Sequence, residues 1–336
     1  MSDLVAGLTA GARVAVRTRI DPAPSSGPTL TDTVGELTHV DEVTVRISTR
    51  TGEIELRRDH VVAARTIPPK PTRRGAPHRA IGIEDLHLVM TKGQPGLEES
   101  WLGDAGEGWL LRAGGGWTGR SNSALPVGSP DLPLPEAVDA VEAWYAARGL
   151  APLVMLPRPI GAATADDSLG ALLLARGHRE LPVVDVLTGW TDTLLDAPAP
   201  APTGLSVRRS EHPDEEWFAG GSPRLLEHLA TAREVLSVPT RQIFLTAHDG
   251  AVVGVVRVAL ADGWAGIFGL HVPPSHRGQG VGRWLTQEAA RAAADAGASL
   301  TYLQVERDNV AARSLYLDLG MRPHHEYVYL GPRRTG

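Results

Sequence analysis

The stretch HVPPSHRGQGVGRWLTQEAA, residues 271–290, decides the fold of the last third of this chain. Three of the five residues from 278 to 282 are glycine, and a helical pattern begins directly after them. Glycine costs backbone entropy, so such a cluster indicates a tight turn or the close approach of a ligand to the backbone. The first amides of a helix lack internal partners and carry partial positive charge. Glycines at this point therefore favour a site for an anion such as a pyrophosphate.

Taken alone, this loop leaves a plain tight turn open, because it is neither a Walker A loop nor a complete G-x-G-x-x-G. A second motif lies in ERDNVAARSLYLDLGMRP, residues 306–323, which contains N-x-x-A-x-x-L-Y-x-x-x-G-M. With Arg277-x-x-Gly280-x-Gly282 about 27 residues earlier, this pair resembles the GCN5-related N-acetyltransferase (GNAT) superfamily. The resemblance covers residues 205–333 and implies an α/β (α+β) fold, a mixed sheet with flanking helices.

The resemblance implies that acetyl-CoA is the co-substrate, and we expect no metal. It places acetyl-CoA between two splayed parallel strands, which here are IFGLHV and LTYLQV. The implied contacts lie at the end of the first strand, in the glycine loop and in the Asn/Tyr motif. They are Leu270, His271, Val272, Arg277, Gly278, Gln279, Gly280, Val281, Gly282, Arg283, Asn309, Ala312 and Tyr316.

The implied reaction is direct attack of a neutral amine on the thioester, with Tyr316 placed to protonate the leaving thiolate. A packing role for Tyr316 on an amphipathic helix is the alternative. The base is less clear, because Gln304 stands where some relatives have a glutamate. Glu306 is the nearest candidate, on the same strand face as Gln304, and its alternative is a surface charge. His324, His325 and Glu326 enter the final strand, but adjacent histidines are more often surface residues and lack a third metal ligand.

The chain divides at proline-rich segments. Residues 1–66 read as short alternating strands, with Val43, Val45, Ile47 and then Ile54 and Leu56 inward, and resemble a small SH3-like β-barrel. We predict linkers at 67–82 and 197–204, where proline is frequent and periodicity is absent. Between them, residues 83–196 form a mixed region, and the catalytic GNAT domain spans 205–333.

The middle region repeats the order of the last domain in outline. GWLLRAGGGWTGR parallels GIFGLHVPPSHRG, and LLLARGHRELPVVDVLTG parallels LYLDLGMRPHHEYVYLG. The middle copy lacks R-x-x-G-x-G and a clear Asn/Tyr pair. We therefore predict a tandem pair with a degenerate first GNAT-like half, which completes the core and forms one wall of the acceptor cleft. An SH3-like barrel before two GNAT halves resembles a bacterial family labelled histone acetyltransferase-like, a label that does not fix the acceptor.

Composition bounds the remaining possibilities. The 336 residues carry a formal charge of −6 and contain no cysteine, so disulfides and thiolate nucleophiles are excluded. Residues 1–66 hold eight Arg and nine Asp/Glu, which makes nucleic acid an unlikely partner. No apolar run is long enough for a membrane span, and we expect a cytoplasmic protein. We expect the acceptor to be a small-molecule or protein amine, and the barrel to dock a partner or the other domains. The alternative function is an acyl-CoA-binding regulatory module without turnover.

Overall fold

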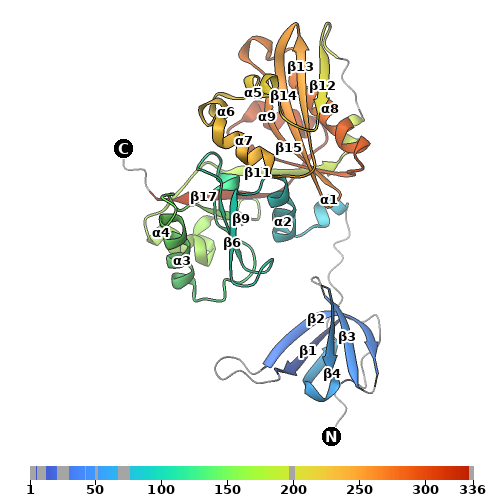
Figure 1. The fold of residues 1–336 in the computed structure, drawn as a ribbon, viewed down its shortest axis with the longest axis vertical. Coiled ribbons are helices and arrows are strands. Elements are labelled where there is room, and N and C mark those ends of the chain that lie inside the picture. Colours follow the sequence, from blue (N-terminus) through green and yellow to red (C-terminus); the bar gives the residue numbers. More distant parts are fainter. Residues whose placement is uncertain are drawn as a thin grey trace. The chain divides into compact units, whose positions relative to one another are not determined.

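The computed structural model describes residues 5, 13–20, 30–41, 43–49, 52–66, 76–196 and 201–332. The chain forms two compact units, Met1–Gly75 and Ala76–Gly336. Both units are drawn in Figure 1. Within the predicted linker 67–82, residues 67–75 lie outside the described ranges, and a short helix α1 (Pro77–Ala80) follows.

The N-terminal unit is a small antiparallel sheet with the order β4-β3-β2-β1-β5. Its strands are β1 (Arg13–Arg19), β2 (Leu30–Val40), β3 (Thr44–Thr49), β4 (Gly52–Arg57) and β5 (Val61–Thr66), with a 3-10 turn η1 (Arg58–His60) before the last. These strands confirm the small β-rich domain that the alternation predicts.

The core of this unit comes from alternate positions on the strands. Its buried side chains are Val5, Val14, Val16, Leu37, Val45, Ile47 and Val61. The backbone of β3 approaches β2 closely at Gly35, where a Cβ atom would lie 2.3 Å from the carbonyl oxygen of Ser48. The predicted inward pattern is wrong at two positions: Val43 precedes β3 and is exposed, and Ile54 on β4 is also exposed. An edge strand such as β4 has only one neighbour to cover its side chains.

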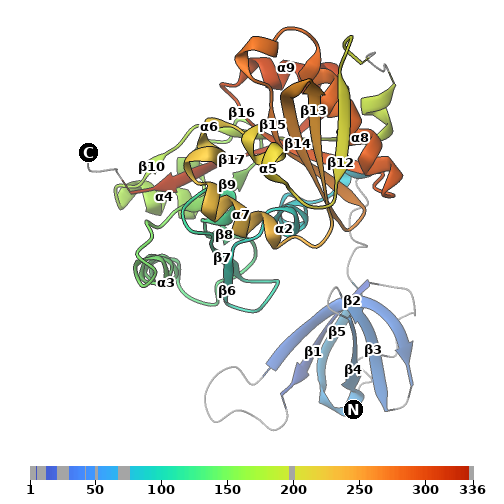
Figure 2. The same ribbon diagram turned by 45° about the horizontal axis from the view of Figure 1, so that its top comes forward.

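The second unit is built on one large mixed sheet, with helices on both faces (Figure 2). Its strands are β9 (Val154–Arg158), β10 (Arg179–Glu180), β11 (Val184–Trp190), β12 (Ser206–Ser210), β13 (Gln242–Asp249), β14 (Ala251–Ala261), β15 (Trp264–His271), β16 (Leu300–Glu306) and β17 (Arg322–Gly331). A second sheet of three strands consists of β6 (Glu98–Leu102), β7 (Trp109–Ala113) and β8 (Leu125–Pro126).

Besides α1, eight α-helices lie in the described part of this unit. They are α2 (Ile83–Gly93), α3 (Leu134–Ala146), α4 (Ser168–Ala175), α5 (Glu215–Ala219), α6 (Pro223–Glu227), α7 (Leu229–Ser237), α8 (Val281–Asp295) and α9 (Val310–Asp318). The sequence pattern predicts α3, α4, α8 and α9. It does not predict α2 or the short run α5–α7.

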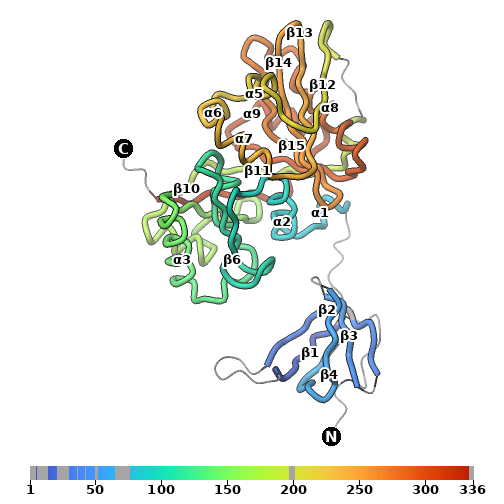
Figure 3. Tube along the Cα trace, viewed as in Figure 1, coloured from blue at the N-terminus to red at the C-terminus, as the bar shows by residue number. Residues whose placement is uncertain are grey.

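The middle and last regions share the large sheet through an exchange of strands. Strand β11 comes from the middle region, yet it pairs antiparallel with β16 and β17 of the last region. In return, β17 pairs with β9 of the middle region. The chain trace in Figure 3 shows this mixing of the two regions. The ranges predicted as 83–196 and 205–333 therefore contribute to a common core.

The two faces of the sheet have separate apolar cores. On one face, Leu303 and Val305 of β16 pack with Val281 and Leu285 of α8. On the other face, Tyr302 of β16 packs with residues of α2 and of the three-stranded sheet. Adjacent residues of β16 thus serve opposite faces, as strand geometry requires.

Candidate active site

Two parallel strands separate at the centre of the large sheet. Strands β15 and β16 pair from Trp264 to Ile267 and from Leu300 to Leu303, and no further pair joins the described residues of these strands. The separation begins at a bulge, where the register between β14 and β15 shifts and Gly269 adopts a φ of 62°. Glycine suits this left-handed conformation because it has no Cβ. The bulge turns the end of β15 away from its neighbour.

The glycine loop lies between the end of β15 and α8. Gly278 and Gly280 have φ values of 74° and 81°, and a Cβ atom at either position would meet nothing within 4 Å. Gly280 is the N-cap of α8, and no side chain caps the first turn of the helix. The start of α8 therefore combines uncapped amides with open space above the backbone, as an anion site requires.

Two long side chains hold this loop in shape. Arg277 donates from Nε to the carbonyl oxygen of Val272 at 2.9 Å, and Gln279 donates from Nε2 to that of Ser275 at 2.9 Å. Val281 is buried against the sheet, so only its backbone faces the loop. A Cβ at Gly282 would make ordinary contacts, at 3.7 Å with Leu315 and 4.0 Å with Val272.

The Asn/Tyr motif lies on α9. Asn309 is the N-cap of this helix, and its side-chain oxygen accepts a hydrogen bond from the backbone N–H of Ala312 at 3.2 Å. Tyr316, one turn further on, is 7% exposed and packs in the core beneath α8. Burial raises the pKa of Tyr316 to about 12, so its phenol is protonated at neutral pH.

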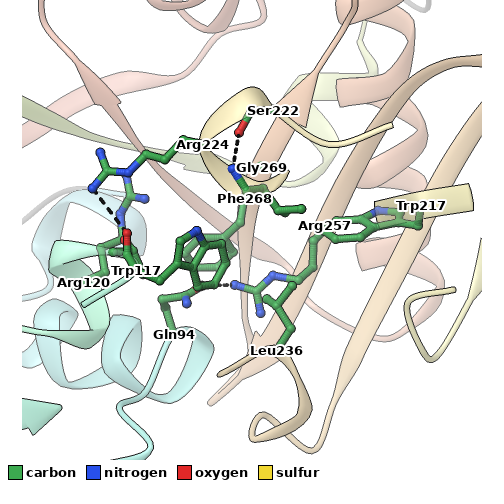
Figure 4. A pocket seen from close by; sticks show the side chains of 12 residues that line it. Gln94, Trp117, Arg120, Trp217, Ser222, Arg224, Leu236, Arg257, Phe268 and Gly269 are labelled. Atoms are coloured by element: carbon green, nitrogen blue, oxygen red, sulfur yellow. Dashed lines mark hydrogen bonds between the residues drawn. The ribbon is translucent and has the colours of Figure 1, made fainter. Parts of the chain in front are cut away.

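A cavity of about 180 Å³ borders β15 at Phe268 and Gly269 (Figure 4). It is lined by Gln94, Trp117, Thr118, Arg120, Trp217, Ser222, Arg224, Leu225, Leu236, Arg257, Phe268 and Gly269. Gly269 belongs to the bulge, so the cavity reaches the point where β15 leaves β16. The loop 117–120 of the middle region forms one wall, and helices α5–α7 form another.

Arg257 occupies the floor of this cavity. Its side chain is 1% exposed and donates from one NH group to the carbonyl oxygen of Gly93 and from the other to the side-chain oxygen of Gln94. Its guanidinium carbon lies 4.4 Å from the ring centroid of Phe268. Burial, with a contribution from the nearby charge of Arg120, lowers the pKa of Arg257 to about 9, which leaves it charged at neutral pH.

At the position where some relatives have a glutamate, the side-chain amide of Gln304 is held by a hydrogen bond. Gln304 on β16 accepts a hydrogen bond at its side-chain oxygen from the hydroxyl of Tyr327 at 2.9 Å. Glu306 lies two residues further on, at the exposed end of β16 and on the same face as Gln304. Of the predicted base candidates, Glu306 is the one that combines this face with access to solvent.

The prediction of surface positions for the two adjacent histidines is wrong for His325, whereas His324 is half-buried. His325 is 0% exposed, and its Nε2 lies 2.8 Å from Nε2 of His87 on α2. Glu326 is also buried, in an ion pair of 2.9 Å with Arg158. Strand β17 runs between β11 and β9, and this central position covers side chains that would be exposed on an edge strand. His271 donates from Nδ1 to the carbonyl oxygen of Gly220, at the C-terminal end of α5, at 2.9 Å.

The residues that line the cavity belong to no sequence motif. Arg257 alone has a sequence signal: it interrupts the apolar strand AVVGVVRVALA at a position in phase with Val255 and Ala259, both of which are buried. Within the described ranges, no three His, Asp or Glu side chains gather as metal ligands would. The same ranges contain no helix that is long and apolar enough to cross a bilayer.

Comparison with known proteins decides the family. A family model described as "Probable histone acetyltransferase Rv0428c C-terminal" matches residues 82–330. The chain belongs to this family. A second model, "Rv0428c N-terminal Sm-like domain", matches residues 8–65. The N-terminal unit of this family is thus described as Sm-like, and no comparison supports the SH3-like assignment specifically.

One relative extends the match over nearly the whole chain. The probable histone acetyltransferase Rv0428c of Mycobacterium tuberculosis is 33% identical over 335 residues, which cover 97% of this chain and 96% of that protein. An uncharacterized N-acetyltransferase of Bacillus subtilis, YobR, is 31% identical over 91 residues, which cover 27% of this chain and 37% of that protein.

Solved structures agree on the fold. A GCN5-related N-acetyltransferase from Kribbella flavida has a TM-score of 0.54 at 20% identity, covering 76% of this chain and 96% of that chain. A tandem GNAT protein of the clavulanic acid biosynthesis pathway has a TM-score of 0.50 at 19% identity, covering 66% of this chain and 77% of that one. This family member is therefore a GNAT-type acyltransferase, as the paired motifs predict.

Proposed function

We propose that this chain transfers an acetyl group from acetyl-CoA to an amine that binds in the cavity lined by Arg257 and Phe268. The observation that carries the proposal is the bulge at Gly269, which borders both the separation of β15 from β16 and the acceptor cavity. A thioester lying along the end of β15 and an amine in the cavity would meet at this point.

The residues present fit acetyl-CoA. The uncapped first turn of α8, with open space at Gly278 and Gly280, suits a pyrophosphate, which the backbone amides would hold. Backbone groups of Leu270 and Val272, beyond the last β15–β16 pair, are available to the pantetheine arm. Arg277 shapes the loop through its Nε, and Asn309 and Ala312 fix the start of α9 beside it. When bound, acetyl-CoA supplies an acyl group activated as a thioester.

The chain's own groups have three tasks in this reaction. Backbone N–H groups at the bulge would stabilise negative charge that develops on the acyl oxygen. Glu306, directly or through water, would take a proton from the attacking amine. Tyr316, which burial keeps protonated, would donate its phenolic proton to the departing sulfur. Acyl transfer then forms one N–C bond and breaks one C–S bond.

We further propose that the middle region is a degenerate GNAT half. The reciprocal pairing of β9 with β17 and of β16 with β11 supports this reading, because equivalent strands of two related halves would be exchanged. The middle region contributes Trp117, Thr118 and Arg120 to the cavity wall. The N-terminal unit, whether it is closer to SH3-like or Sm-like barrels in detail, would dock a partner or the rest of the chain.

The deciding experiment measures CoA release from acetyl-CoA across a panel of amines, together with acetyl-CoA binding by calorimetry. Release that depends on an amine is the expected result, with one acetyl-CoA bound per chain. Binding without release for any amine would favour a regulatory acyl-CoA module instead. Two acetyl-CoA molecules per chain would contradict the degenerate first half.

A glycine variant tests the pyrophosphate site separately. Gly282→Ala fits the fold, since its Cβ would make only ordinary contacts, but it adds an atom where the ligand's phosphates approach. We expect acetyl-CoA affinity to fall at least fivefold. The control is Gly189→Ala on β11, whose Cβ would also make only ordinary contacts, at 3.7 Å with Met321. Unchanged affinity in Gly282→Ala would remove the proposed site.

A further inference from the structure

The cavity beside Gly269 concentrates positive charge. Three of the residues that line it are arginines, namely Arg120, Arg224 and Arg257, and no Asp or Glu is among its described lining residues. A smaller neighbouring cavity shares Arg120 and Gln94 with it and adds Arg112. Within the described ranges, none of these four arginines forms an ion pair with a carboxylate.

The partners of these arginines are neutral. Arg257 donates to the carbonyl oxygen of Gly93 and to the side-chain oxygens of Gln94 and Gln242. Arg224 donates to the carbonyl oxygen of Trp117 at 3.3 Å. The Nε of Arg120 is buried and has no hydrogen-bond partner among the described residues. Burial opposes the charge of Arg120, while Tyr327 and Tyr329, and to a smaller extent Glu306, raise the pKa of Arg120.

Elsewhere, this fold pairs its buried charges. Glu326 is buried between Arg158 and Arg307, at 2.9 Å and 2.8 Å respectively. Asp185, equally buried, accepts from Arg307 and from Arg313. A buried charge without a counter-ion is costly. Arg257 is buried and so is the Nε of Arg120, whereas Arg224 is exposed. The two buried groups on one cavity therefore indicate that a ligand supplies the negative charge.

We propose that the acceptor is a small amine that also carries an oxyanion group, a carboxylate or a phosphate, which binds between Arg120 and Arg257 while its amine faces Gly269. This inference rests on the proposed acetyltransferase function and specifies its substrate class. Arginine presents a planar fork of donors that matches either oxyanion in two-pronged contact. The volume of about 180 Å³ is below the roughly 300–1,000 Å³ of pockets for drug-sized ligands, which favours a molecule of amino-acid size.

The residues give the ligand an orientation. Arg224 comes from α6 and Arg120 from the loop 117–120, and both line the same cavity as Arg257. Figure 4 draws the three side chains. The aromatic rings of Trp117 and Trp217 form apolar walls that exclude water and strengthen the charge interaction. The anionic end is thereby held among the arginines. The opposite end of the cavity is left for the amine beside the bulge.

The test compares amines that differ only in the anionic group. L-alanine is paired with L-alaninamide, and phosphoethanolamine with ethanolamine, with acetyl transfer measured at constant ionic strength. We expect the charged member of at least one pair to react with a kcat/KM at least tenfold higher, and the preferred pair distinguishes carboxylate from phosphate. Equal rates within both pairs, with transfer intact, would overturn the proposed substrate class and leave the acetyltransferase function standing.

Variants assign the effect to the arginines. Arg120→Met should reduce the preference for the charged amine to less than threefold, and Arg120→Lys should retain part of it. The control Arg179→Met, at an exposed position on β10, should keep the full preference. Because no carboxylate among the described residues forms an ion pair with Arg120, Arg120→Met should unfold at the same urea concentration as the unmodified chain or at a higher one. A clear loss of stability would instead mark Arg120 as a structural residue and overturn its assignment.

A binding measurement separates this inference from the function on which it rests. Succinate and phosphate, which cannot accept an acetyl group, should raise the thermal unfolding temperature of the unmodified chain, but not that of Arg120→Met. Chloride at matched ionic strength is the control. If no amine is acetylated while this stabilisation is seen, the proposed function fails and the anion site stands. Absence of stabilisation together with equal amine rates overturns the anion site.

Discussion

The Nε2 atom of His325, on β17, lies 2.8 Å from the Nε2 atom of His87, on α2. On its other side, Nδ1 of His325 lies 2.8 Å from Nδ1 of His324, whose Nε2 is 3.0 Å from the carbonyl oxygen of Ile81. A carbonyl only accepts, so His324 must donate from Nε2, and the chain of donors and acceptors then runs consistently through three neutral imidazoles. These hydrogen-bonded histidines join β17 to the segment 81–87.

The histidine chain predicts how stability depends on pH. Burial, and then the neighbouring imidazoles, lowers the pKa of His87 well below its usual value and that of His325 to about 3. Because the folded pKa lies below the unfolded value, the stability is complete above about pH 6.5 and is lost as pH falls toward the folded pKa. Each of these imidazoles should cost about 1.4 kcal/mol of unfolding free energy between pH 7.5 and 5.5.

The measurement is urea unfolding at several pH values for the unmodified chain and for His87→Leu. The variant removes one titrating group, so the loss between pH 7.5 and 5.5 should be smaller in it. His228→Gln, an exposed position at the end of α6, is the control and should behave as the unmodified chain. An identical pH dependence in all three proteins would contradict the neutral buried chain.

Glu326 provides a prediction about stability. Its buried carboxylate accepts from Arg158, from Arg307 and from the backbone N–H of Gly161. Glu326→Gln leaves Arg158 buried without its counter-ion, and we expect a loss of about 3 kcal/mol in the free energy of unfolding. The exposed pair of Lys92 with Asp262 is the matched contrast: Lys92→Gln should change stability by less than about 1 kcal/mol. Equal effects in denaturant unfolding would show that burial of the first pair is not decisive.

Tyr316→Phe tests the proposed general acid. The substitution keeps the ring in the core beneath α8 and removes only the phenolic proton donor. We expect kcat to fall about 100-fold while acetyl-CoA affinity stays within twofold, because the hydroxyl acts on the leaving group. Tyr145→Phe, which removes the hydroxyl bonded to the carbonyl oxygen of Arg112 far from the glycine loop, controls for the loss of a buried hydroxyl. An unchanged kcat in Tyr316→Phe would leave this residue a packing role.

Glu306→Gln tests the proposed base by its effect on the pH profile. If Glu306 accepts the proton, kcat/KM should fall at least 100-fold, and the fall in rate on the acidic side of the profile should disappear. Glu180→Gln, an exposed position on β10, should leave rate and profile unchanged. A retained acidic limb in Glu306→Gln would assign the proton to another group. His325 is unsuited to act as the base in place of Glu306, because it is buried away from solvent and burial lowers its pKa to about 3.

Local sequence was sufficient to predict the strands of the last region and helices α8 and α9, but not α5–α7. The strands and helices around the glycine loop follow the hydrophobic periodicity and the glycines at their ends. Helix α8, for example, begins beside Gly280 and ends before Gly297. Such signals depend on backbone conformation within a few residues, so one sequence carries them. The same reasoning failed for His325, because burial of a strand depends on which strands lie beside it.

The sequence by itself determined the GNAT-type motif pair and the order of elements that carries it, since both depend on short spacings along the chain. Only the tertiary structure decided that β11 and β17 are exchanged between regions and that Arg120, Arg224 and Arg257 face one cavity. These residues lie more than 100 positions apart from first to last, and no local pattern links them. Their juxtaposition follows from packing, which brings distant side chains to one place on the sheet.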